Sequence, residues 1–331
     1  MRSAIAIAAC ALASAALAND SVAVTAAGGL ELRQSREIDM VSEDLYVSAL
    51  EIRVRYVFRN RSRRPVSTIV AFPMPGIDLA EDDAVDRSPP RDFSTRVDGR
   101  PVTMQIERRA ALGAVDHTSL LAGLGVPVQN SEDGEGPTVD DALARLDPAQ
   151  RRRLEALGLV QGVDRTRNGR PVRRYHPRWT IRETWHWRQV FPVGRNIVVE
   201  HRYVPGAGGS ASTGFGNANL QNEDFVREAR RRYCIDAEFL AGAARLVRPA
   251  SGYINVTEQW ISYILTTGGN WRAPIGDFRL VVDKGNARNL VSFCGEGIRR
   301  IGPTRFEMRR RNWRPTRDLD VLILAPQRED E

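Results

Sequence analysis

Histidine and cysteine are scarce in this sequence, which has four and three of them among 331 residues. No two histidines share a metal-binding spacing such as i, i+4 on a helix. The Gly-x-Ser-x-Gly motif of a nucleophile elbow is absent as well. The short glycine motifs lack a following phosphate-loop lysine and are typical of turns. The residues therefore indicate no particular reaction and predict neither a metal nor a cofactor.

Long hydrophobic runs are also missing after the N-terminus. No later segment has about 18 consecutive apolar residues, so none is expected to span a membrane. The N-terminus itself has a basic start at Arg2, an apolar run over residues 4–17 and a small-x-small site ending at Ala18. These three parts are typical of a secretory signal peptide. We therefore predict that residues 1–18 are removed, that Asn19 begins the mature chain, and that the protein is periplasmic or secreted.

A second interpretation of the N-terminus depends on Cys10. Residues 7–10 resemble a lipoprotein cleavage box, which would make Cys10 a lipid anchor. Cleavage there would leave almost no apolar region ahead of the cysteine, so we favour the secretory signal peptide.

Lysine is nearly absent, so the basic residues are almost all arginine. The whole chain has 48 basic and 41 acidic residues, and loss of Arg2 with the leader leaves 47 against 41, or +6. Arginine clusters occur at residues 61–64, 151–153, 230–232 and 309–311. Such runs usually form solvated faces, and export argues against a nucleic-acid partner. An anionic envelope surface stays a weak candidate partner.

The two cysteines of the predicted mature chain are Cys234 and Cys294. An even count in an exported protein favours one disulfide. In the chain-entropy model, a disulfide that closes a loop of about 60 residues raises the free energy of unfolding by about 4 kcal/mol. The alternative, a metal pair, lacks nearby ligands of suitable spacing.

Alternating side chains predict strands, and the clearest case is the stretch from residue 50 to residue 75. Leu50, Ile52, Val54, Tyr56 and Phe58 share one parity, and charged residues occupy the other. A polar turn over residues 60–65 leads to a second apolar run over residues 66–72, which predicts a hairpin. A further hairpin is predicted around Asp98-Gly99, between residues 93–97 and 102–106.

Residues 107–160 have a different pattern, and we expect a helical insertion there. Residues 107–113 and 119–124 are rich in alanine and leucine. Thr138 and Asp147 are predicted helix caps. The insertion could carry function or could cover an open end of the sheet.

The remaining chain predicts more strands and a second domain. Alternation over residues 179–187 and an apolar run over residues 197–203 predict strands that close the first domain. Two short helices follow as a connector, and then come five strands without helical crossovers, which should be antiparallel. The predicted fold is mainly β: residues 19–210 form one antiparallel β-sandwich-like domain with the helical insertion, and residues 211–331 form the helical connector and a second antiparallel β domain.

Two resemblances add to this interpretation. Residues 56–60, 64–66 and 72–75 resemble the start of the vault and inter-alpha-trypsin β-sandwich domain, and residues 190–203 are similar to its closing strands. Nearly the whole mature chain also resembles a family of exported bacterial proteins known only as a domain of unknown function. The motifs that carry this second resemblance are residues 56–75, 263–276, 278–285, 291–297 and 318–324. It implies a periplasmic or secreted protein and implies no activity.

Two candidate sites follow from the residues. His186 and His201 lie on strands that could pair, so with Glu183 they could form an acid–base or metal site, although ordinary paired surface residues are the simpler interpretation. The unusual loop at residues 270–275 predicts a contact surface at Trp271, Arg272 and Asp277. The tryptophans could also line a groove for a sugar or peptide, but burial in the core is the usual place of tryptophan.

We therefore expect a non-enzymatic exported module that binds or supports a protein or glycan partner of the cell envelope or the extracellular space. The alternative is a hydrolase or metal-assisted enzyme that uses the residues near His186 and His201.

Overall fold

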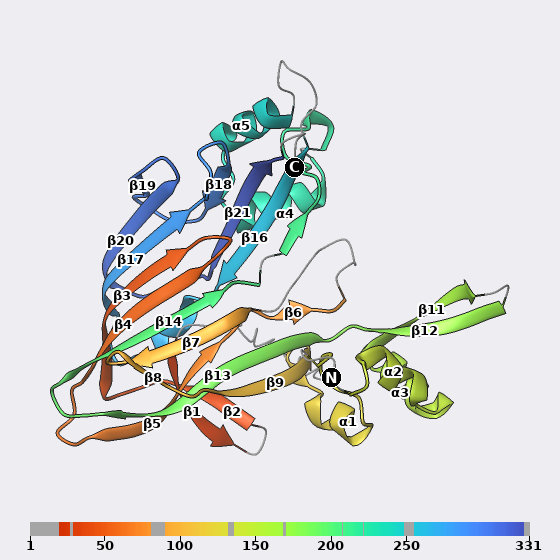
Figure 1. The fold of residues 1–331 in the computed structure, drawn as a ribbon, viewed down its shortest axis with the longest axis horizontal. Helices are drawn as coiled ribbons and strands as arrows, with labels where there is room; N and C mark the ends of the chain where they lie inside the picture. Colours follow the sequence, from red (N-terminus) through yellow and green to blue (C-terminus); the bar gives the residue numbers. More distant parts are fainter. Residues whose placement is uncertain are drawn as a thin grey trace, which may run out of the picture. The chain divides into compact units, whose positions relative to one another are not determined.

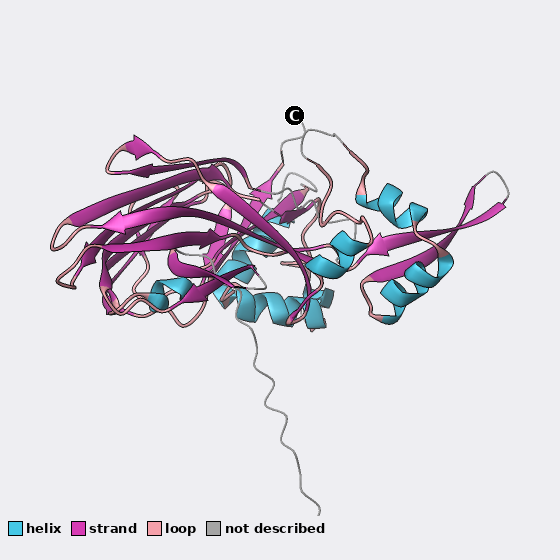
Figure 2. Cartoon of the chain, turned by 90° about the horizontal axis from the view of Figure 1, so that it is seen from below, coloured by secondary structure: helices cyan, strands magenta, loops and turns pink. Residues whose placement is uncertain are grey.

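The computed structural model describes residues 20–26, 29–80, 90–131, 136–167, 170–206, 208–220, 222–247 and 255–327. The predicted signal peptide, Cys10 and Asn19 lie outside these ranges. Within them, no helix combines the length and the apolar character needed to cross a membrane. Strands predominate and the helices are short, so the predicted mainly β class is confirmed (Figure 2).

Contacts divide the chain into two compact units. The larger unit consists of residues 17–108 and 182–331, and the smaller one includes residues 109–181. The helical insertion predicted at residues 107–160 falls almost wholly in the smaller unit. The predicted domain boundary near residue 210 lies inside the larger unit.

An eight-stranded sheet is the largest element of the larger unit, and its strand order is β19-β20-β17-β3-β4-β14-β7-β8 (Figure 1). Its strands are β19 (Arg299–Arg300), β20 (Arg305–Trp313), β17 (Ile275–Asp283), β3 (Ile38–Val47), β4 (Ile52–Asn60), β14 (Asn196–Val204), β7 (Arg91–Val97) and β8 (Arg100–Pro101). β3 and β17 pair in parallel, and the other neighbours pair antiparallel. The parallel pair was not predicted, because more than 200 residues separate its strands.

The alternation predicted for β4 is confirmed from Ile52 onward. Ile52, Val54, Tyr56 and Phe58 are buried, and Arg53 and Arg55 are exposed. Leu50 lies before the strand with 82% of its surface exposed, so its predicted burial was wrong. The buried side chains join one core cluster with residues of β5 and β13 from the second sheet, including Phe72 and Trp187.

The second sheet has the order β9-β13-β5-β1-β2, and β6 also pairs with β13. Its strands are β9 (Gln105–Leu112), β13 (Thr180–Phe191), β5 (Val66–Pro73), β1 (Ser21–Ala26), β2 (Gly29–Arg33) and β6 (Ile77–Asp78). The helix predicted over residues 107–113 was therefore wrong. Sheet pairing of β9 overrides the helical propensity of an alanine-rich run.

Two predicted strand pairings were also wrong, and both errors have one cause. β4 belongs to the eight-stranded sheet and β5 to the second sheet, so the turn at residues 60–65 is a corner between sheets and not a hairpin turn. β13 and β14 are likewise in different sheets. Short polar turns join strands of one sheet and strands of two facing sheets equally well, and local sequence does not distinguish the two cases. The hairpin turn predicted at Asp98-Gly99 is confirmed, since β7 pairs with β8 and both turn residues have positive φ. The predicted second strand over residues 102–106 was wrong, because β8 is only Arg100–Pro101 and β9 of the other sheet begins at Gln105.

A four-stranded sheet and a helical pair complete the larger unit. The sheet has the order β15-β16-β21-β18, and all of its pairs are antiparallel. Its strands are β15 (Gly208–Ser210), β16 (Val256–Tyr263), β21 (Leu319–Pro326) and β18 (Leu290–Phe293); the helices here are α4 (Asp224–Arg232), α5 (Ala237–Val247), and the 3-10 turns η1 (Ala218–Leu220) and η2 (Thr266–Asn270). The two helices predicted in this region are thus confirmed. The predicted disulfide between Cys234 and Cys294 is also present.

The smaller unit combines short helices with a hairpin. Its elements are β10 (Val115–Asp116), α1 (Thr118–Gly123), α2 (Val139–Arg145), α3 (Pro148–Ala156), β11 (Val160–Arg167) and β12 (Arg170–Pro177). Both predicted caps are confirmed: Thr138 and Asp147 each form a reciprocal capping box with the third residue of the helix. The β11–β12 hairpin was not predicted.

Candidate functional site

The predicted enzyme-like site does not assemble. Glu183 is buried on β13, accepts from Arg108 Nε at 2.7 Å and accepts from the Trp185 indole at 2.6 Å. His186 is three residues further along the same strand and therefore lies on its opposite face. Burial lowers the pKa of His186, and the nearby Glu107 carboxylate opposes that change.

His201 lies on β14 of the other sheet, and its hydrogen bonds go to neither of these residues. Its ring is buried, with Nδ1 2.8 Å from Thr95 Oγ1 and Nε2 3.1 Å from Asp20 Oδ1. Among the described residues, no group of histidine, cysteine and carboxylate side chains is arranged to hold a metal ion. Glu183 and His201 thus each have their own hydrogen-bond partners, and none of the printed bonds joins two of the three predicted residues.

The predicted contact loop is only partly exposed. Trp271 is fully buried, and its indole donates to the backbone carbonyl of Asp20 at 2.7 Å, so this side chain belongs to the core. Arg272 is exposed and makes two bonds of 2.7 and 2.8 Å to the Asp39 carboxylate. Asp277 is exposed on β17. Of the three predicted residues, only Arg272 and Asp277 can reach a partner.

The solvent face of the eight-stranded sheet has a stronger concentration of functional groups. Cross-strand register aligns one row from β20 to β7, which consists of Arg309, Arg279, Asp44, Arg55, Glu200 and Arg96. Neighbouring strands lie about 4.8 Å apart, so each side chain in the row is within reach of the next. The two carboxylates separate the arginines of the central strands and offset part of their mutual repulsion.

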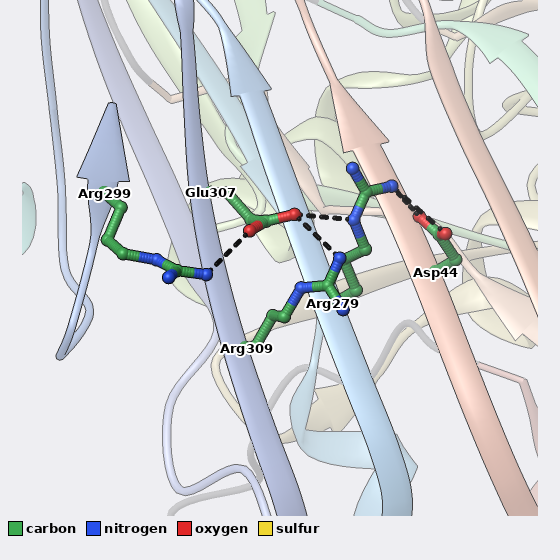
Figure 3. Close-up of polar contacts among 5 residues, drawn as sticks. All are labelled: Asp44, Arg279, Arg299, Glu307 and Arg309. Carbon is green, nitrogen blue, oxygen red and sulfur yellow. Dashed lines mark hydrogen bonds and ion pairs between the residues drawn. The ribbon is translucent and has the colours of Figure 1, made fainter. Parts of the chain in front are cut away.

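Glu307 organises one end of this row (Figure 3). Its carboxylate accepts from Arg279 at 2.8 Å and from Arg309 at 3.1 Å, and it pairs with Arg299 at 3.2 Å. Arg279 also reaches Asp44 at 3.2 Å. Hydrogen bonds from Arg309 and Arg279 lower the pKa of Glu307 to about 2. The carboxylate is therefore ionised at neutral pH and holds three guanidinium groups in place.

The next row of the same face contains further fixed arginines. Glu51 pairs with Arg53 at 2.9 Å and also with Arg202. The Arg53 guanidinium lies 4.5 Å above the ring of Tyr46, a distance at which cations and aromatic faces attract each other. These contacts hold both arginines near the centre of the sheet.

Arginines of both rows line an open groove of about 520 Å³. We call it the arginine groove and define it by the six arginines that line it, Arg53, Arg55, Arg96, Arg202, Arg279 and Arg305. Only two carboxylates, those of Asp44 and Glu200, line it as well.

Arg55 and Arg96 provide the least neutralised charge of the arginine groove. Arg55 is 3.7 Å from the Glu200 carboxylate. The Arg96 guanidinium donates to the Gly99 carbonyl at 3.1 Å, and among the described residues no ion pair includes it. Both side chains are exposed. Preorganised guanidinium groups with spare donors are suited to carboxylate, sulfate or phosphate groups.

A partial signal for this groove is present in the sequence. Arg53, Arg55 and Arg59 alternate with apolar residues on β4, and the cluster at residues 309–311 falls on β20. Each looked like an ordinary solvated face. Only the β3–β17 pairing places the two sets on one sheet.

The chain is thus a mainly β protein whose largest sheet has a cationic face. Residues 18–322 match the profile of the domain of unknown function DUF4424, and the chain belongs to this family. The expected resemblance to a domain of unknown function is therefore confirmed.

Comparison with curated proteins finds no match. Among solved structures, a protein from Legionella pneumophila subsp. pneumophila str. Philadelphia 1, provisionally described as a nutrient-binding protein, is similar at 16% identity with a TM-score of 0.41. The similarity covers 88% of this chain and 68% of that chain.

Proposed function

We propose that this protein is a non-enzymatic binding module of the cell envelope or extracellular space, and that it binds an anionic ligand in the arginine groove. The observation that carries the proposal is the excess of six arginines over two carboxylates in one open groove. The groups that hold these arginines, Glu51 and Glu307 among them, lie at its edges, so the guanidinium groups are oriented before a ligand arrives.

Most of the charged groups that line the arginine groove are guanidinium groups, which suit binding. Among the described residues, the only histidine that contributes to its wall is His201, whose side chain is fully buried. A guanidinium is always protonated and does not act as a base. These properties favour recognition of an anion over its chemical conversion.

An extracytoplasmic location is part of the proposal. The N-terminal sequence has the three parts of a signal peptide. The disulfide between Cys234 and Cys294 also favours this location, because disulfides form in oxidising compartments. An anionic glycan of the envelope is the partner class that matches both the location and the cationic groove.

The proposal is tested by titrating the full mature chain with dextran sulfate and, separately, with neutral dextran in a calorimeter. We expect the sulfated polymer to bind and the neutral polymer not to bind. Affinity should fall as salt rises from about 50 to about 200 mM, because salt screens exposed charges. Equal binding of the two polymers, or no binding of either, would contradict the proposal.

A further inference from the structure

The disulfide between Cys234 and Cys294 lies at the surface, on the wall of a pocket of about 630 Å³. Cys234 is exposed and Cys294 is half-buried. The apolar part of the pocket wall comes from Leu265, Leu280, Met308, Trp313 and Leu319. A thiol reagent can therefore reach this disulfide without unfolding of the chain.

The two sulfur atoms have different electrostatic surroundings. Cys234 Sγ lies 3.7 Å from Nη1 of Arg317, whose other terminal nitrogen donates to the Arg232 carbonyl at 2.9 Å. Cys294 Sγ lies 3.4 Å from that same carbonyl oxygen and 3.9 Å from the carbonyl oxygen of Arg231. A guanidinium stabilises a thiolate, whereas carbonyl oxygens favour a protonated thiol. Cys234 is thus the better leaving group of the pair.

The backbone at Cys234 is strained. Its φ is 54°, in the left-handed region that residues other than glycine seldom adopt. Disulfides that are exposed or strained are the ones that exchange readily with thiols.

Other contacts hold the same elements together without the disulfide. Ser292 Oγ donates to the Tyr233 carbonyl at 2.9 Å, and Arg232 pairs with Asp320 at 2.8 Å. An apolar cluster that includes Val226 and Leu322 packs the helices α4 and α5 against the four-stranded sheet. Reduction should therefore leave the fold intact.

We propose that the bond between Cys234 and Cys294 is a thiol–disulfide exchange site that accepts two electrons from a dithiol. One thiolate of the dithiol attacks Cys294 Sγ, the bond between the two cysteines breaks, and Cys234 leaves as a thiolate beside Arg317. The second thiolate of the dithiol then attacks the mixed disulfide and displaces Cys294. The dithiol ends as a disulfide, Cys294 takes up one of its two protons, and the other goes to Cys234 or to solvent.

The order of attack is tested with glutathione on the full mature chain under native conditions. After an acid quench, peptide mass spectrometry should find the mixed disulfide on Cys294, and near-UV circular dichroism should be unchanged. A mixed disulfide mainly on Cys234, or reaction only after denaturant unfolds the chain, would overturn the proposal.

The role of Arg317 is tested separately by alkylation of Cys234 in the C294S variant. We expect the pH midpoint of alkylation to lie below the ordinary thiol value of about 8.5, and R317Q to raise it by about one unit. R310Q is the matched control, since Arg310 lines the same pocket but pairs with Glu296 at 2.9 Å, and it should have little effect. An equal effect of R317Q and R310Q, or none, would refute the assignment.

If the C294S variant does not fold, the role of Arg317 is tested on the intact disulfide. The rate of its reduction by dithiothreitol should be at least about threefold lower in R317Q than in R310Q, because the leaving thiolate loses its cation. Equal rates in the two variants would refute the assignment.

Discussion

His201 and Asp20 form a polar pair inside the core of the larger unit, with Nε2 3.1 Å from Oδ1 and no exposed surface on either side chain. Desolvation raises the pKa of Asp20, and His201 opposes that change. Rings surround the histidine, the nearest being Phe72 with a centroid distance of 4.8 Å. The pair therefore ties the first described residue of the chain to β14.

Removal of either member of this pair should destabilise the fold strongly. We expect D20A and H201A each to lower the free energy of unfolding by about 3 kcal/mol, because a buried polar partner is left unsatisfied. Urea unfolding of the single variants and of the double variant checks the coupling. If the two effects simply add to within about 0.5 kcal/mol, the residues do not act as a pair.

Asn60 should stabilise the corner between the two sheets. Its Nδ2 donates to the carbonyls of Arg64 and Phe191 at 2.8 and 2.9 Å, and its Oδ1 accepts from the Ser62 amide at 2.8 Å. N60A should lower the free energy of unfolding by about 2 kcal/mol, measured by urea denaturation. N60D loses both donors and sets a buried carboxylate against the carbonyl oxygens of Arg64 and Phe191, so it should destabilise the fold at least as much as N60A. A neutral N60A would show that the corner does not depend on this side chain.

Sequence was sufficient for many strands of the larger unit and insufficient for their partners. The alternation of β4 reflects one buried and one exposed face. A strand shows this pattern whichever strands it pairs with. The polar turn at Asn60 predicts a hairpin, whereas the structure has a corner between two sheets, because the choice between strand neighbours depends on how the two sheets pack. The arginine groove depends in addition on β17, which lies more than 200 residues from its neighbour β3.

Glu307 should make stability depend on acid pH. Its pKa in the fold is about 2, against an ordinary value of 4.5, so the native state binds this proton less tightly than the unfolded state does. Its contribution is fully present above pH 4.5 and is lost as pH falls toward 2. E307Q should therefore lower the urea midpoint at pH 7 and have a much smaller effect near pH 2. An equal effect of E307Q at both pH values would rule out this linkage.

The mature N-terminus distinguishes the two interpretations of the leader. Mass spectrometry of the protein from its native host should find Asn19 as the first residue, without a lipid. A mature chain that begins at a lipidated Cys10 would instead establish a membrane-anchored protein. A chain that retains residues 1–18 would contradict export by cleavage.

The central claim, that the arginine groove binds anions, is tested most directly by calorimetric titration of two double variants with dextran sulfate at low salt. R55Q/R96Q removes the two least neutralised charges of the groove, and R230Q/R231Q removes the same charge from exposed positions in the last turn of α4. We predict that R55Q/R96Q binds at least about tenfold more weakly than wild type, while R230Q/R231Q stays close to wild type. Equal weakening of both variants, or unchanged binding by R55Q/R96Q, would contradict the account.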